Sequence, residues 1–192
     1  MEKIRNFIAF QKYADTLKHL KRTGWIMSNV PQPETVASHS WRMAVMALQS
    51  ASYIESEGAD LMRVLKLCLL HDVAEGVIGD IVPEHHQDTD KKISDVQKEE
   101  MEKQAAQNLA ESVDFKDILS VFEEYNSGST KEAKITKDLD KLDMLLQAET
   151  YREKYPNLER LKEFMKWNEN AVKLPFYSEV LAEIKKEVKS HD

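Results

Sequence analysis

Residues 69–80 read LLHDVAEGVIGD and decide how the rest of the chain is interpreted. They begin at the end of the apolar segment 64–70, which has the composition of a buried helix. His71 and Asp72 place two metal-binding side chains there, and Glu75 follows one helical turn beyond His71. This spacing predicts that three polar groups meet beside a core helix. In the alternative interpretation they end that helix and support its surface.

A second histidine favours the metal-site interpretation. His39 lies in ETVASHSWRMAVMA, residues 34–47, on the apolar face of a predicted helix, where a lone histidine is usually a satisfied core residue. The dipeptide His-Asp is weak evidence alone, because it recurs as His191-Asp192 at the polar C-terminus. The combination of His39 with His71-Asp72, both in apolar surroundings, predicts a metal site.

The composition indicates one all-α globular domain. A chain of 192 residues suits a single hydrophobic core. Its 5 glycines and 5 prolines provide few turns for a sheet-rich fold, whereas strong helix formers such as Leu, Ala, Met, Glu and Lys dominate. We therefore expect a single-domain helical bundle.

Charge and cysteine content exclude several classes of partner. The formal net charge of −7 argues against binding to a nucleic-acid polymer, which usually requires a basic face. The single cysteine, Cys68, lies in an apolar run, so we expect it to pack in the core of a protein from a reducing compartment. No apolar run approaches the roughly 20 residues of a membrane span. We expect a cytoplasmic protein with no membrane partner.

The spacing of apolar residues predicts about seven to eight helices. Pro31 and Pro33 disfavour helical geometry, so the segment 24–34 is expected to be a loop. Thr35, Asp60 and Asp114 are the expected helix caps. The predicted helices cover residues 4–20, 35–57, 60–76, 88–112, 114–125 and 130–154, followed by one that opens at Pro156 and one introduced by Pro175 and Ser178.

The order of these features resembles the HD-domain superfamily of metal-dependent phosphohydrolases, and more closely its 5'-deoxynucleotidases. The resemblance covers roughly residues 22–147 and rests on four segments, RTGWIMSNV, PETVASHSWRMAVMA, LLHDVAEGVIGDI and ITKDLDKLDMLLQAETY. It implies one HD domain over residues 1–192. The core of that domain is expected at about 22–155, with C-terminal helices over 156–190 packing on it.

The resemblance also implies a set of metal ligands, namely His39, His71, Asp72 and a later aspartate. The predicted helix 130–154 offers Asp138, Asp140 and Asp143. Helical periodicity leaves the fourth ligand open, because Asp138 and Asp140 flank the buried stripe on opposite sides. The Lys-x-x-Asp pattern of the family selects Asp140, with Asp138 as the alternative. Mixed nitrogen and oxygen donors suit one divalent ion, which we expect to be Mn, Co, Fe, Ni, Zn or Mg.

Five further residues receive functional roles from the resemblance. Glu75 is expected to position or deprotonate the attacking water, and Asp80 to assist at the leaving oxygen or contact the sugar. Arg22, Trp25 and Thr35 are expected to contact the substrate. Three of these residues have a structural alternative, since Asp80 suits a turn, Trp25 suits the core and Thr35 suits a helix cap.

The activity implied is hydrolysis of deoxyribonucleoside 5'-monophosphates to deoxynucleoside and phosphate. The alternatives are another HD-type nucleotide phosphohydrolase, acting on triphosphates, cyclic nucleotides or alarmones, and a metal-stabilised interaction module without turnover. Relatives imply a homodimer. We expect Tyr125 to be structural, His85 and His86 to be exposed, and the polar segment 88–112 to present a solvated face.

Overall fold

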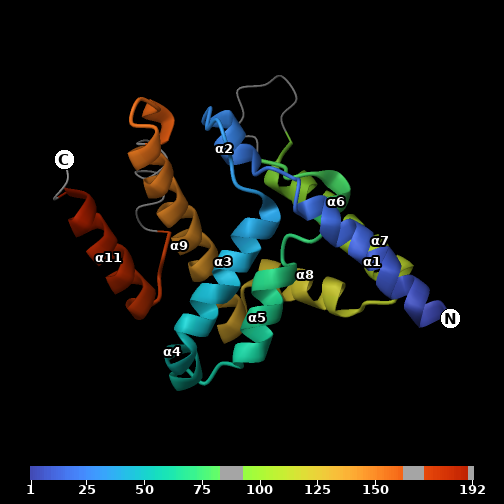
Figure 1. Ribbon diagram of the computed structural model, residues 1–192. Helices are drawn as coiled ribbons and strands as arrows, with labels where there is room; N and C mark the ends of the chain where they lie inside the picture. Colours follow the sequence, from blue (N-terminus) through green and yellow to red (C-terminus); the bar gives the residue numbers. More distant parts are fainter. Residues whose placement is uncertain (83–92, 162–170, 190–192) are drawn as a thin grey trace.

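The computed structural model describes residues 1–82, 93–161 and 171–189, whose regular elements are helices without a β-strand (Figure 1). This confirms the predicted all-α class. The expected exposure of His85 and His86 concerns residues outside the described ranges. The helices are α1 (Glu2–Leu17), α2 (Thr23–Met27), α3 (Val36–Gln49), α4 (Ala51–Ser56), α5 (Leu61–Leu70), α6 (Glu75–Ile78), α7 (Asp95–Ser112), α8 (Asp117–Ser127), α9 (Lys131–Lys154) and α11 (Pro175–Lys189).

Three helices, α3, α5 and α9, contact one another at the centre of the molecule (Figure 1). Their facing side chains form the largest core cluster, and α11 adds to it from the outer side of α9. Cys68 is a free, buried residue of this cluster, which confirms its predicted core role. The cluster includes Met43, Ala47, Ile54, Val64, Cys68, Ile135, Leu139, Leu142, Leu145, Tyr177 and Leu181.

A second core cluster lies on the other side of α3 and α5. It joins α1, α6, α7 and α8, and Val36 at the start of α3 is fully buried in it. The beginning of α3 and the end of α5 therefore lie where the two clusters meet. Among the described residues, no helix combines the length and apolar character needed to cross a membrane.

Side-chain caps fix where the central helices begin. The Thr35 hydroxyl accepts the backbone N–H of Ser38, and the Ser38 hydroxyl accepts the backbone N–H of Thr35, which forms a capping box at α3. The Asp60 carboxylate accepts the Met62 N–H at α5, and Thr130 caps α9 in the same way. The predicted caps Thr35 and Asp60 are confirmed. They fix where α3, which carries His39, and α5, which His71 directly follows, begin.

The expected loop over residues 24–34 is wrong for its first part, because α2 forms there. The Asp80 carboxylate accepts the backbone N–H of Thr23 at 2.7 Å, and the Thr23 hydroxyl donates to the Asp80 carbonyl at 2.7 Å. The Asp80 carboxylate thus accepts the backbone N–H of the first residue of α2 from a segment 57 residues away. The side chain of Trp25, within α2, is buried. The prediction of a loop was based on Pro31 and Pro33, which give no information on a bond from Asp80 to the start of α2.

Two predicted helices are shorter than expected. The helix over 35–57 breaks at Ser50, whose hydroxyl donates to the Met46 carbonyl and also contacts the Tyr177 hydroxyl at 2.8 Å. The helix over 60–76 ends at Leu70, because the chain then tightens into turns closed by i to i+3 bonds such as Glu75 N–H to the Asp72 carbonyl. Glu75 consequently begins the separate helix α6.

Asp114 does not cap a helix, contrary to the prediction. It adopts a positive φ of 49°, and α8 begins three residues later at Asp117. The start of the predicted helix 88–112 and most of the helix expected after Pro156 lie outside the described residues. The domain boundaries expected at 22–155 and 156–190 stay a prediction.

Candidate metal centre and catalytic cavity

Three buried side chains from the central helices converge on one point. His39 comes from α3, His71 directly follows α5, and Asp140 comes from α9. One ligand atom from each residue lies within 4.8 Å of the other two. The Nε2 atoms of both histidines are buried without a hydrogen-bond partner. Since an unsatisfied buried polar atom is costly, this arrangement fits a metal ion that both rings would share.

Hydrogen bonds at the opposite nitrogen orient both imidazole rings. His39 Nδ1 lies 2.7 Å from the Asp143 carboxylate. His71 Nδ1 lies 3.2 Å from the Leu67 carbonyl and 3.1 Å from the Cys68 carbonyl. Because these partners only accept, each Nδ1 carries the proton, and each Nε2 is left as a donor of electrons to a metal.

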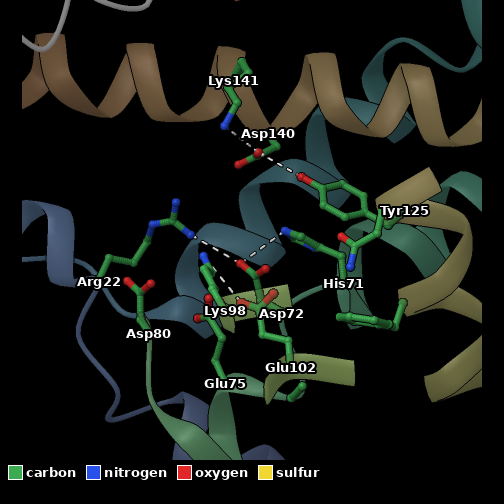
Figure 2. Close-up of a pocket in the computed structure, with 13 residues that line it drawn as sticks. Arg22, His71, Asp72, Glu75, Asp80, Lys98, Glu102, Tyr125, Asp140 and Lys141 are labelled. Carbon is green, nitrogen blue, oxygen red and sulfur yellow. Dashed lines mark hydrogen bonds and ion pairs between the residues drawn. The ribbon is translucent and has the colours of Figure 1, made fainter. Parts of the chain in front are cut away.

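Asp72 lies beside this convergence point and turns toward Arg22. Its Oδ2 is 3.2 Å from His71 Nε2 and 4.0 Å from His39 Nε2. The same oxygen accepts from the Arg22 guanidinium at 3.4 Å, as Figure 2 shows. Burial opposes ionisation of this carboxyl, but His71 and Arg22 hold the pKa of Asp72 well below its usual range. Asp72 is thus an anionic group shared between the centre and Arg22.

The two candidate aspartates of α9 point in different directions. Asp140 Oδ1 is 3.3 Å from His39 Nε2, and its other oxygen accepts the Tyr125 hydroxyl at 2.9 Å. Asp138 Oδ2 instead accepts the backbone N–H groups of Lys173 and Leu174, at 2.9 and 2.6 Å. The structure therefore brings Asp140 to the two histidines, whereas Asp138 binds the backbone of the segment that directly precedes α11 (Pro175–Lys189).

Negative charge is concentrated around His39. Burial and the Arg22 charge favour the neutral ring, but the nearby carboxylates of Asp140 and Asp143 raise the pKa of His39 to about 9. Burial likewise opposes ionisation of Asp140, yet the Lys141 ammonium and His39 hold the pKa of Asp140 well below its usual range. The carboxylates that favour a proton on His39 equally favour a cation beside it.

A cavity of about 220 Å³ opens next to these groups (Figure 2). Glu75 forms part of its wall, is 5% exposed, and has an Oε2 atom without a hydrogen-bond partner. Burial and the neighbouring charges of Asp72 and Asp80 raise the pKa of Glu75 well above its usual range. The lining residues are Arg22, His71, Asp72, Ala74, Glu75, Asp80, Lys98, Glu102, Phe122, Tyr125, Asn126, Asp140 and Lys141.

Arg22 and Asp80 occupy the same end of the cavity (Figure 2). The Asp80 carboxylate bonds to Thr23, the residue that follows Arg22, and so fixes the chain from which the guanidinium extends. Arg22 is partly buried and lines the cavity, and a single contact of 3.4 Å to Asp72 engages one of its guanidinium nitrogens. This end of the cavity is suited to an anionic group of a ligand.

The other two expected substrate contacts lie away from the cavity lining. Trp25 is 2% exposed, packs edge-on against Tyr151 with ring centroids 5.3 Å apart, and donates its indole N–H to Glu34 at 2.9 Å. Thr35 is engaged in the capping box of α3. The structure therefore assigns Trp25 a packing role and Thr35 a capping role.

Several cavity residues were missed by the sequence interpretation. Lys98 and Glu102 belong to the polar helix α7, which we expected to be a solvated face, yet both line the cavity and lie 3.4 Å apart. Tyr125, expected to be structural only, lines the cavity and bonds to Asp140. Burial and the Asp140 charge raise the pKa of Tyr125, which keeps its hydroxyl protonated as a donor. Lys141 lies 3.2 Å from Asp140.

A match to the HD domain family spans residues 14–177 and so includes every group of this centre. The chain belongs to the HD-domain family. Its two histidines, the His71-Asp72 pair and the later Asp140 fall in the order from which the family resemblance was inferred. The family is metal-dependent, which agrees with the unpaired Nε2 atoms.

Relatives and solved structures extend this assignment along the whole domain. The HD-domain chain is 38% identical over 162 residues to "5'-deoxynucleotidase HDDC2" of Danio rerio, covering 83% of this chain and 76% of the relative. It is 37% identical to the Homo sapiens protein of the same name, covering 83% and 75%. A conserved hypothetical protein from Pyrococcus furiosus is 31% identical, with a TM-score of 0.71 and coverage of 95% and 99%.

Asp143 supports the HD-domain centre without facing its cavity. Asp143 is fully buried, and its carboxylate bonds to His39 Nδ1. The Arg42 guanidinium donates both to the Asp143 carboxylate and to the Asp143 backbone carbonyl. We expect Asp143→Asn to weaken metal binding about 10- to 100-fold, because it loses the carboxylate that fixes the His39 ring. Metal titration of the stripped protein measures this change.

A partly exposed carboxylate on α8 supplies the control for Asp143→Asn. Asp117 pairs with Lys66 at 2.6 Å on the surface of α8 and makes no contact with the centre. Asp117→Asn should leave metal affinity unaltered, since exposed ion pairs contribute roughly 0 to 1 kcal/mol. Equal metal affinity in the two variants would show that Asp143 does not orient His39 for metal binding.

Proposed function

We propose that this protein is a metal-dependent 5'-deoxynucleotidase, which hydrolyses deoxyribonucleoside 5'-monophosphates to a deoxynucleoside and phosphate. The observation that carries the hydrolytic part is the convergence of two unpaired, buried imidazole Nε2 atoms on Asp140 beside a charged cavity. The choice of substrate is supported by the relatives named 5'-deoxynucleotidase, which the chain matches over 83% of its length.

One divalent metal would be held by His39, His71, Asp72 and Asp140. Two nitrogen and two carboxylate donors suit Mn, Co, Fe, Ni or Zn, with Mg also accommodated. When bound, such an ion supplies Lewis acidity toward a phosphate oxygen and lowers the pKa of water. The anionic carboxylates around His39 and the fixed Nδ1 protons of both rings support this assignment.

Positive side chains around the cavity would bind and orient the phosphate. Arg22 enters from the start of α2, Lys98 from α7 and Lys141 from α9, so the cationic groups surround the cavity from three elements (Figure 2). Arg22 offers a planar donor fork that matches two phosphate oxygens. The cavity is also lined by carboxylates, so these cations and a bound divalent metal would together offset that negative charge for an anionic substrate.

Glu75 would hold or move the proton of the attacking water. It is buried against the cavity, one of its oxygens has no partner, and its pKa is raised well above the ordinary carboxyl value. A carboxyl with these properties can exchange a proton nearer neutral pH than an exposed one. Asp80 acts as a positioning residue, because its carboxylate fixes the segment that carries Arg22.

Phosphate release from a nucleotide panel tests the proposal. The protein is stripped of metal, refilled separately with Mn, Co, Mg or Zn, and assayed on deoxyribo- and ribonucleoside 5'-monophosphates. We expect metal-dependent release that favours the deoxy substrates and that Asp72→Ala abolishes. Deoxyribonucleoside triphosphates and cyclic nucleotides serve as comparison substrates, since their hydrolysis would identify a different activity of the HD-domain site.

The outcomes separate activity from metal binding. Turnover of triphosphates or cyclic nucleotides in place of the monophosphates would replace the proposed substrate class. Metal binding that Asp72→Ala removes, without phosphate release by the parent protein from any substrate, would favour a metal-stabilised interaction module. The expected homodimer stays a prediction, which a molar mass from light scattering tests.

A further inference from the structure

A second cavity of about 610 Å³ lies between the end of α8, the middle of α9 and the segment before α11. It is larger than the catalytic cavity and carries none of the metal-binding groups of His39, His71 or Asp140. Its lining residues are Tyr125, Ser127, Gly128, Lys134, Lys137, Asp138, Lys141, Ala171, Lys173 and Leu174. We call it the lysine cavity, after the four lysines in this set.

The charge of the lysine cavity is strongly positive. Four lysines face one carboxylate, Asp138, whose Oδ2 already accepts the backbone N–H groups of Lys173 and Leu174. Within the described ranges, no carboxylate forms an ion pair with Lys134, Lys137 or Lys173. The fourth lysine, Lys141, pairs with Asp140 at 3.2 Å, so three of the four ammonium groups keep their charge without a carboxylate partner in the part of the chain that the structure describes. The cavity is therefore electrostatically suited to an anion.

Lys137 is held in place at the centre of this wall. Its ammonium donates to the Asn126 carbonyl at 3.1 Å and lies 5.5 Å from the centre of the Tyr125 ring. Gly128 has a φ of 60°, and a Cβ at this position would lie 3.0 Å from Lys137 Nζ. The absent side chain at Gly128 thus leaves room for the lysine. These contacts preorganise the ammonium without neutralising its charge.

The lysines are close enough to affect one another. Burial and the ammonium groups of Lys141 and Lys173 lower the pKa of Lys137. Like charges that face a common cavity repel each other, and this repulsion is relieved when an anion lies between them. Lys134 is one turn before Lys137 on α9, so it extends the same row of positive charge.

The lysine cavity adjoins the catalytic cavity through two shared residues. Tyr125 and Lys141 line both. The Tyr125 hydroxyl donates to Asp140, and the Lys141 ammonium lies 3.2 Å from Asp140. A ligand in the lysine cavity would therefore lie beside Tyr125 and Lys141, which contact the candidate metal ligand Asp140. Its other contacts would be with residues that do not line the catalytic cavity.

We propose that the lysine cavity binds an oligophosphate anion, in the form of a free phosphate chain or the triphosphate of a nucleotide. A single phosphate would engage part of the lysine row, whereas a chain of three phosphates can span it and carries the matching charge. Lysine ammonium groups bind phosphate oxygens as flexible point charges. This site is distinct from the one that would hydrolyse a monophosphate, and the proposal does not depend on that activity.

Calorimetric titration of the metal-stripped protein with inorganic triphosphate tests the site, with EDTA present so that no metal contributes. The test variant is Lys134→Gln/Lys173→Gln, which removes two cavity charges outside the catalytic cavity. We expect its affinity for triphosphate to fall at least roughly tenfold, and the parent affinity to fall with added salt. The matched control Lys3→Gln/Lys12→Gln removes two exposed charges from α1 and should bind as the parent does.

The outcomes decide both the site and the source of the anion. Equal affinity of the test and control variants, or no binding to the parent, would overturn the proposal. Loss of binding in Arg22→Gln with retention in the test variant would place the anion in the catalytic cavity and would also overturn it. A nucleoside triphosphate that binds more tightly than inorganic triphosphate assigns the site to a nucleotide; equal affinity assigns it to the phosphate chain. Thermal melts confirm that each variant folds.

Discussion

Asp140→Asn is expected to remove most of the bound metal and to lower phosphate release at least about 100-fold. Loss of a residue that only supports a ligand already costs roughly 10- to 100-fold in metal affinity or activity. Asp140 is nearer the centre than such a residue, because its Oδ1 lies 3.3 Å from His39 Nε2 and its ligand atom belongs to the converging group of three. Metal content after dialysis and phosphate release from a deoxyribonucleoside 5'-monophosphate measure the two effects.

Asp138→Asn is the matched control, since it makes the same substitution two residues away on α9. Its carboxylate serves the backbone N–H groups of Lys173 and Leu174, and an asparagine oxygen can still accept these bonds. We expect parental metal content and a modest loss of stability, visible as a lower melting temperature. If Asp138→Asn lost the metal while Asp140→Asn retained it, the fourth ligand would be Asp138.

The candidate metal ligands His39, His71 and Asp72 could be proposed from the sequence because they depend on local signals. His39 follows the capping residue Thr35 by four positions on α3, and His71-Asp72 comes directly after the apolar helix α5, so their positions in the sequence place them beside the core. Periodicity could not choose between Asp138 and Asp140, because both flank the buried stripe of α9 and both are buried. Their roles depend on what packs against each flank, and that is a tertiary property.

The rest of the cavity depends on contacts between distant segments. Lys98 and Glu102 form an i to i+4 pair, which on sequence grounds is typical of a solvated helix face. They reach the cavity because α7 packs its alanine-rich face, Ala105 and Ala106, into the second core cluster. Sequence spacing describes the faces of a helix but not which neighbour covers each one.

Contacts between distant segments also explain the helices that differ from expectation. The start of α2 is satisfied by Asp80, and the break after α3 by Ser50 contacting a tyrosine 127 residues later. Asp143 was one of the three aspartates that the sequence offered, and it lies one turn after Asp140 in the same helix. The contacts of Asp143 with His39 and Arg42 depend on the packing of α3 against α9, and this packing could not be predicted from the spacing of residues in the sequence.

Glu75→Gln is expected to lower the turnover number about 100- to 10,000-fold while the protein keeps its metal. Glutamine has the shape of glutamate but cannot take up the proton of the attacking water. Glu75 lies on the wall of the catalytic cavity but outside the converging group of His39, His71 and Asp140, so the metal should remain. Single-turnover phosphate release and metal content, measured on the same sample, separate the two properties.

Glu102→Gln provides the comparison for Glu75→Gln, because both carboxylates line the same cavity. Glu102 is paired with Lys98 at 3.4 Å, whereas Glu75 has a buried oxygen without a partner. Loss of a partly exposed ion pair costs roughly 0 to 1 kcal/mol, so Glu102→Gln should lower turnover less than about tenfold. Equal losses in the two variants would mean that cavity charge in general, and not a proton held at Glu75, sets the rate. Loss of metal from Glu75→Gln would instead make Glu75 a ligand.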